Sequence, residues 1–268
     1  MKKIFLAFCF IMLLSFSVYA EENRAYFPPV LMYHDIKIKP LNKFDVTVED
    51  FCAQLDFLKE NEYITLSIED FISYLEEKKV FPEKSILITF DDGYNGIYNY
   101  AVPELKKRNM KATFFITTET VGKIDGAYPH ITEQELKEIS SSENFSIGSH
   151  TLTHSHLDKL NNEEKINEIK NSKEILEKIT CKKIQALAYP YGDYDEEVIE
   201  AVKKSGYKIA FAVQDRGLFN NPARWSIPRI SMGMALSENN LKLFKDFIKN
   251  YKNMPQEAFI ERWEMLKN

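Results

Sequence analysis

Short apolar runs alternate along this chain with longer segments in which apolar residues recur every three or four positions. Apolar runs bounded by polar residues are typical of buried strands, and the longer spacing is typical of helices that bury one face. The runs predict strands at 30–33, 85–90, 112–116, 145–148, 184–188, 208–213 and 226–230. The longer segments predict helices at 102–108, 163–179 and 196–205, and helices that begin after residues 47, 67 and 132.

Three of these helix starts carry a capping pattern. A Ser or Thr at the N-cap accepts a hydrogen bond from the backbone three residues on, where an acidic residue stands. The pairs are Thr47 with Asp50, Ser67 with Asp70, and Thr132 with Glu135. After the first pair, Phe51, Leu55 and Leu58 fall on one helix face, so we expect that face to be buried.

The alternation of strands and helices predicts an α/β fold with a parallel sheet, because a helix is the usual crossover between parallel strands. A chain of 268 residues can form one large domain. We therefore predict a single distorted (β/α) barrel of about seven to eight parallel strands, with an open doubly wound sheet as the alternative. Residues 238–268 are expected to form two helices packed outside the barrel.

The first twenty residues differ from the rest. Lys2 and Lys3 precede an apolar run over 4–18, and small residues lead up to Ala20 before an acidic pair. This pattern predicts a secretory signal peptide at 1–20, a mature domain at 21–268 and a secreted or periplasmic location, with cell-envelope association open. An uncleaved membrane anchor is the alternative, although the apolar run is short for a span. After cleavage we expect no stable membrane insertion.

Charge and cysteine content narrow the function classes. Loss of the leader removes two lysines and no acids, so the formal net charge moves from −5 to −7. Such an acidic domain offers no basic surface for nucleic acid or anionic membranes. Cys52 and Cys181 remain, and their wide separation predicts packing roles rather than a disulfide framework. The sequence leaves the oligomeric state open.

Several chemically active residues follow predicted strands. In parallel α/β folds, the chemistry gathers at the carboxyl ends of the strands. Five segments fit that rule: His34-Asp35, Asp91-Asp92, 150–154, 189–192 and Arg229. We therefore expect residues from most of the chain to meet on one rim of the barrel.

The pair Asp91-Asp92 is followed by Gly93, and a turn alone would explain such a string. Adjacent carboxylates repel each other unless a cation or hydrogen bonds compensate. One solution gives one carboxylate to a metal and leaves the other facing the substrate. The string therefore predicts either a turn or half of a metal-assisted site.

His150 and His154 lie four residues apart, so both imidazoles can reach one ion. Two surface histidines in a polar stretch are the alternative reading, and His156 is a further possible ligand. One carboxylate and two imidazoles with open positions for water are typical of a catalytic zinc site. His34 ends the first predicted strand, where a structural role competes with a catalytic one.

At these motifs the chain resembles the polysaccharide deacetylases, carbohydrate esterase family four, over most of 21–268. The motifs are 89–93 (Thr-Phe-Asp-Asp-Gly), 150–154 (His-Thr-x-x-His) and 190–192 (Pro-Tyr-Gly). The resemblance implies an enzyme that removes acetyl groups from sugars by cleaving linear C–N amide bonds. It implies a divalent metal, zinc first, with cobalt, nickel and manganese as alternatives.

The resemblance also implies a role for each matching residue. Asp91 is implied to be the general base, and Asp92 to bind the metal with His150 and His154. The backbone amide of Tyr191 is implied to stabilise the oxyanion.

Two departures from the family pattern are informative. Ala188 stands where the third motif usually has an arginine that braces the base, so Arg229 or Arg224 would have to take that place. No histidine follows His156, which makes His34 the candidate for the family's general acid. This order resembles the permuted subgroup that includes the poly-β-1,6-N-acetylglucosamine deacetylases, as do the segments 30–35 and 227–230.

The expected function is therefore removal of N-acetyl groups from an acetylated polysaccharide, most simply poly-N-acetylglucosamine. Peptidoglycan, chitin oligomers and xylan are alternative substrates for the same chemistry. A barrel glycosidase that pairs Asp91 with another carboxylate is a different enzyme class, and it gives the histidine pair no role. A non-catalytic carbohydrate-binding domain is the remaining alternative.

Overall fold

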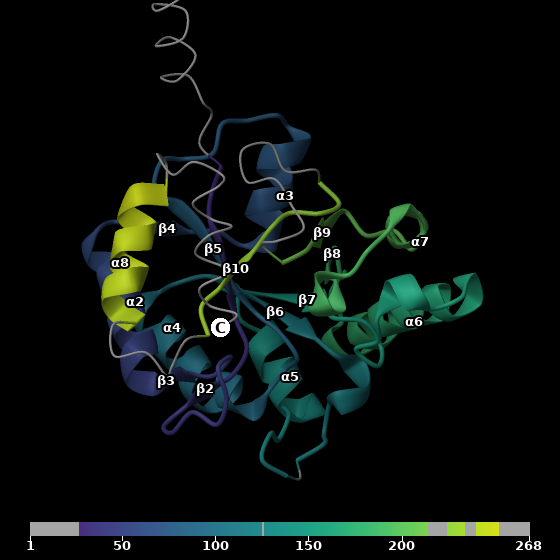
Figure 1. The fold of residues 1–268 in the computed structure, drawn as a ribbon, viewed down its shortest axis with the longest axis horizontal. Helices are drawn as coiled ribbons and strands as arrows, with labels where there is room; N and C mark the ends of the chain where they lie inside the picture. Colours follow the sequence, from purple (N-terminus) through teal and green to yellow (C-terminus); the bar gives the residue numbers. More distant parts are fainter. Residues whose placement is uncertain (1–26, 125, 214–223, 234–239, 252–268) are drawn as a thin grey trace, which may run out of the picture.

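The computed structural model describes residues 27–124, 126–213, 224–233 and 240–251. Within these residues, eight short parallel strands curl into one sheet, helices cover its outside (Figure 1), and β2 and β3 form a separate parallel pair. The strands are β1 Val30–Tyr33, β2 Ile36–Lys37, β3 Val46–Thr47, β4 Ile64–Thr65, β5 Ser85–Phe90, β6 Ala112–Ile116, β7 Phe145–Ser149, β8 Ala186–Ala188, β9 Ile209–Phe211 and β10 Ile230–Ser231.

Helices follow most of the long strands. The α-helices are α2 Val48–Glu60, α3 Ile68–Glu76, α4 Val102–Arg108, α5 Glu133–Ser140, α6 Asn162–Thr180, α7 Glu196–Lys204 and α8 Asn240–Asn250. Single turns of other helix types are η1 Ile97–Ala101, η2 Thr118–Thr120, η3 Leu157–Lys159 and η4 Pro190–Gly192. The three predicted caps are confirmed, since Thr47, Ser67 and Thr132 each accept from the backbone three residues on.

The sheet runs in the order β10-β1-β5-β6-β7-β8-β9, with β4 on β5, and all pairings are parallel. One segment links its two ends. Ile227 exchanges backbone hydrogen bonds with Ala210 and Ala212 next to β9, and Ile230 then pairs with Leu31 of β1. The predicted α/β class and distorted (β/α) barrel are confirmed.

Alternate residues of each strand point to opposite sides of the sheet, and two apolar clusters result. Ile86, Ile88 and Phe90 belong to the cluster under the outer helices. Leu87 belongs to the second cluster, which fills the inside with residues such as Phe115 and Ala188. The same alternation sets the direction of the residue that follows each strand. Asp91 lies four residues after Leu87, so its side chain points to the inside of the barrel as that of Leu87 does.

The inside of the barrel is tight at the site end. Gly148 of β7 lies against Phe115 of β6, and a Cβ at this glycine would collide with the phenylalanine ring. A larger residue there would push apart the two strands whose ends carry the histidine loop. Gly148 is therefore required by the packing beneath the site.

The structure departs from the prediction in a few places. The strand predicted at 226–230 is reduced to β10, since Pro228 lacks an N–H and Arg229 turns its side chain inward. Strands β2, β3 and β4 were not predicted, because two-residue strands leave no periodic signal. The helix α8 agrees with the first half of the expected tail, and the rest of that tail lies outside the described residues.

The predicted signal peptide at 1–20 also lies outside the described residues. Within the part of the chain that the structure describes, no helix has the length and apolarity needed to cross a membrane. The boundary between a leader and a mature domain at residue 21 stays a prediction.

Candidate active site

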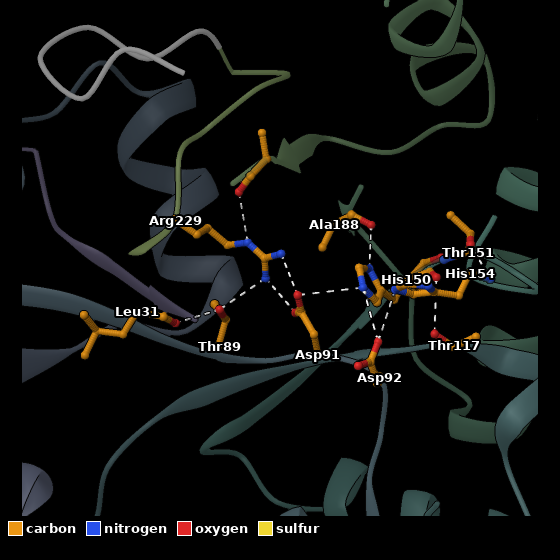
Figure 2. Close-up of polar contacts among 12 residues, drawn as sticks. Leu31, Thr89, Asp91, Asp92, Thr117, His150, Thr151, His154, Ala188 and Arg229 are labelled. Atoms are coloured by element: carbon orange, nitrogen blue, oxygen red, sulfur yellow. Dashed lines mark hydrogen bonds and ion pairs between the residues drawn. The ribbon is translucent and has the colours of Figure 1, made fainter. Parts of the chain in front are cut away.

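A buried ion pair forms the centre of the site. Asp91 follows β5 and is 2% exposed, and Arg229 is fully buried beside it. The guanidinium donates two hydrogen bonds, from Nη1 to Oδ1 and from Nη2 to Oδ2 of Asp91, both of 2.6 Å (Figure 2). This bidentate geometry fixes the plane of the carboxylate as well as its position.

The rest of the Arg229 side chain is held equally firmly. Its Nε donates to the carbonyl of Ala212 at 3.2 Å, and Nη1 also lies 3.4 Å from the Thr89 hydroxyl. That hydroxyl in turn donates to the carbonyl of Leu31 at 2.7 Å. Strands β1 and β5 and the residue that follows β9 therefore all contribute to the position of one carboxylate.

Electrostatics keep Asp91 ionised. Burial by itself would raise the pKa of this carboxyl, but the adjacent charge of Arg229 is the main cause that lowers the pKa to about 2. The two hydrogen bonds from Arg229 act in the same direction. Asp91 is thus a fixed carboxylate throughout the neutral pH range, able to accept a proton from a group placed beside it.

Asp92, His150 and His154 form a second group next to this pair. The Nε2 atoms of the two imidazoles lie 3.5 Å and 3.4 Å from Oδ1 of Asp92. One ligand atom from each residue lies within 4.8 Å of the other two. Oδ1 of Asp92 is buried and has no hydrogen-bond partner among the described residues.

The histidines present their Nε2 atoms to the same point. Nδ1 of His150 lies 2.8 Å from the carbonyl of Ala188, which can only accept, so Nδ1 donates to it and Nε2 is the nitrogen that faces Asp92. Burial, and after it the nearby His150, lowers the pKa of His154, so its imidazole is neutral. A carboxylate oxygen without a hydrogen-bond partner among the described residues, placed between two imidazole Nε2 atoms, fits a divalent cation such as zinc.

His34 reaches the same rim from the end of β1. By strand alternation its side chain points to the inside of the barrel, as that of Val30 does. Its ring lies 5.2 Å from the ring of Phe44, and it is close enough to Asp91 and His154 to interact with both electrostatically. Its Nδ1 is buried without a hydrogen-bond partner among the described residues. A buried, unpaired imidazole nitrogen is unfavourable unless a ligand or water completes it.

Tyr191 comes from η4, after β8, and its backbone has φ of +59°. Its ring stacks on His156 at 3.8 Å and contacts His154 edge-on at 4.6 Å, yet 53% of the residue is exposed. No hydrogen bond from its backbone N–H occurs within the described part of the chain. That N–H is thus available to an acceptor beside His154.

The structure shows which of the alternative residues considered from the sequence lie beside Asp91 and Asp92. Arg224 donates to Glu76 at 2.8 Å on the outside of the barrel, so Arg229 rather than Arg224 reaches Asp91. His156 pairs with Asp193 at 2.7 Å and is not part of the group around Asp92. Arg229 also precedes β10 instead of following a strand, so it reaches the site by its side-chain length and not by the strand-end rule.

Comparison with known proteins gives a consistent family. The family model described as polysaccharide deacetylase matches residues 78–210. The poly-β-1,6-N-acetyl-D-glucosamine N-deacetylase of Staphylococcus epidermidis is 31% identical over an alignment of 250 residues, and the match covers 85% of this chain and 85% of the relative.

Solved structures agree. The Streptococcus pyogenes deacetylase PplD, solved with acetate, superposes with a TM-score of 0.70 at 28% identity and covers 81% of this chain and 97% of its own. A Bacillus cereus polysaccharide deacetylase superposes with a TM-score of 0.67 at 30% identity and covers 81% of this chain and 68% of its own.

Proposed function

The chain belongs to the polysaccharide deacetylase family, and from this premise we propose that it is a metal-dependent hydrolase that removes N-acetyl groups from poly-β-1,6-N-acetylglucosamine. The observation that carries the proposal is the fixed carboxylate of Asp91 beside the open group of Asp92, His150 and His154. The named activity of the Staphylococcus epidermidis relative supports the substrate. An exported enzyme would meet this polymer outside the cell, which agrees with the predicted leader.

Asp92, His150 and His154 would hold the cation, and zinc suits their ligand atoms, with cobalt, nickel and manganese as alternatives. A divalent cation polarises a carbonyl and lowers the pKa of a water towards about 7. Asp91 accepts the proton of the water that attacks the acetyl carbon. Arg229 holds Asp91 in one orientation while this happens.

Two further groups complete the reaction. The N–H of Tyr191 donates to the acetyl oxygen as that oxygen gains charge. When the C–N bond breaks, the sugar nitrogen needs a proton, because an amide anion is a very poor leaving group. His34 donates that proton, and the products are acetate and a free sugar amine.

Acetate release from defined glycans tests the proposal. We expect the purified protein to release acetate from β-1,6-linked N-acetylglucosamine oligomers, to lose this activity on treatment with a chelator, and to regain it with zinc. Peptidoglycan fragments, chitin oligomers and acetylated xylan serve as competing substrates. New reducing ends without acetate would indicate a glycosidase, and glycan binding without acetate release under any metal would indicate a binding domain.

Replacement of His34 by alanine tests the acid role. We expect this variant to deacetylate the glycan about 10²-fold more slowly. It should hydrolyse 4-nitrophenyl acetate at nearly the parent rate, since nitrophenolate leaves without protonation. His130→Ala is the matched control, because His130 is another half-buried imidazole on this rim, 4.8 Å from the ring of Tyr94. Equal losses on both substrates would contradict the role of His34.

A further inference from the structure

The loop that carries both histidines has an unfavourable backbone. Thr151 has φ of +66° and His154 has φ of +63°, and neither residue is a glycine. A β-branched residue in the left-handed region is a genuine outlier, and such a backbone persists only where its surroundings impose it. Something outside the loop must therefore hold residues 150–154 in this shape.

The carbonyls of the loop are held by η2. The N–H of Thr118 donates to the carbonyl of Thr151 at 3.2 Å, and the N–H of Glu119 donates to the carbonyl of Leu152 at 2.9 Å. The N–H of His154 closes the turn on the hydroxyl of Thr151 at 3.2 Å. Among the described residues, the N–H groups of Leu152 and Thr153 then have no backbone acceptor.

Glu168 of α6 takes both of these donors. Its Oε2 accepts from the N–H of Leu152 at 3.1 Å and from the N–H of Thr153 at 2.9 Å. Its Oε1 accepts from the Thr153 hydroxyl at 2.6 Å. One turn further along the same helix, Ser172 bonds Ser149 at 2.7 Å, and Ser149 in turn accepts from the N–H of Thr151.

Glu168 is 7% exposed, and within the described residues no cation pairs with it. A buried carboxylate without a counter-charge is poorly suited to stabilising a fold, and an apolar residue of similar size would serve packing better. Its two oxygens are instead satisfied by three donors of one four-residue turn. The effect of the buried carboxylate is therefore to fix the conformation of that turn.

We propose that Glu168 is a positioning residue for His154, acting through the backbone of 151–154. The carboxylate holds Leu152 and Thr153 against α6, and His154, the next residue, is thereby turned to face Asp92 at 3.4 Å. The inference rests on the metal site proposed above and adds to it a residue that touches neither the metal ligands' side chains nor the substrate. No motif in the sequence marks Glu168, since it is one of many acidic residues in a charged helix.

Zinc affinity of the full mature chain is the measurement that tests this role, by competition with a chromophoric chelator. We expect Glu168→Ala to weaken zinc binding by about 10-fold or more, as is usual when a group that orients a ligand is removed. The absorption spectrum of the Co²⁺-loaded variant should also change, because His154 would no longer be held in one orientation. Thr153→Val removes the hydroxyl contacts with Glu168 and Ser155 but leaves both N–H bonds to Glu168, so it should give a smaller loss in the same direction.

Glu168→Gln should retain most of the parent affinity. Its amide oxygen can accept from both N–H groups, and its NH₂ can donate to the Thr153 hydroxyl, which then donates to Ser155 at 2.7 Å. Lys165→Met is the matched control, because Lys165 is a buried charged residue of the same helix that binds Glu197 and not the loop. It should lower the melting temperature without changing zinc affinity.

The possible failures are distinguishable. If the parent protein binds no zinc or other divalent metal, the metal site itself is wrong and the role of Glu168 falls with it. If the parent binds zinc and Glu168→Ala binds it equally well, the positioning role alone is wrong. The positioning role is also wrong if Glu168→Gln loses as much zinc affinity as Glu168→Ala. If Glu168→Ala does not fold, Thr153→Val provides the test, and an unchanged zinc affinity in that variant would contradict the role.

Discussion

Replacing Asp91 by asparagine should reduce acetate release by about 10³-fold while zinc and glycan binding persist. Asparagine has nearly the shape of aspartate, and Asp91 is not one of the three residues of the candidate metal group, Asp92, His150 and His154. What the substitution removes is a carboxylate that is ionised at neutral pH and oriented by two hydrogen bonds. An amide cannot accept the proton of the attacking water at that pH.

The variant also leaves Arg229 facing an NH₂ group, so its folding must be verified before its activity is read. Zinc affinity and binding of the β-1,6-linked oligomer are the two measurements that do this, since both require a formed rim. Acetate release within tenfold of the parent would contradict the base role of Asp91. Loss of zinc binding together with activity would instead show that Asp91 and Asp92 act as one unit.

The central residues of the candidate site could be predicted from the sequence because they lie close together along the chain, directly after predicted strands. Asp91 and Asp92 directly follow a six-residue apolar strand, and His150 and His154 follow another. Strand alternation then places Asp91 on the inner side with Leu87, and parallel pairing brings the two strand ends together. The rule that functional residues follow the carboxyl ends of parallel strands was therefore enough to predict that these residues meet, without knowledge of any tertiary contact.

Other parts of the site depend on contacts that no spacing encodes. The sequence favoured Arg229 for bracing Asp91 but left Arg224 open as an alternative. What separates them in the structure is that Arg229 turns inward while Arg224 lies beside Glu76 on the outside. The segment that links the barrel ends is a single bridge at Ile227 followed by a two-residue strand, too short for a periodic signal. The contacts of Glu168 with residues 152 and 153 could not be predicted from the sequence, because they depend on the packing of α6 against the loop that carries His150 and His154.

Replacing Arg229 by methionine should destabilise the protein by about 3–5 kcal/mol, because it strands the carboxylate of Asp91 in a buried site. For a chain of this size that loss corresponds to a fall in melting temperature of about 10 °C. Methionine fills much of the volume of arginine, so the loss of packing is a minor part. Arg108→Met is the matched control. Arg108 is also largely buried, but its partners Asp56 and Glu104 reach solvent and would stay hydrated, so we expect a loss of about 1 kcal/mol.

A double-mutant cycle separates the ion pair from the packing around it. Asp91→Asn and Arg229→Met each leave one buried group without its partner, whereas the double variant removes both charges together. We therefore expect the double variant to be more stable than Arg229→Met alone, measured by denaturant unfolding of the metal-free protein at neutral pH. Strictly additive losses would contradict a buried, mutually dependent pair. Recovery of stability without recovery of acetate release would show that Arg229 stabilises the fold through the same carboxylate that the reaction requires.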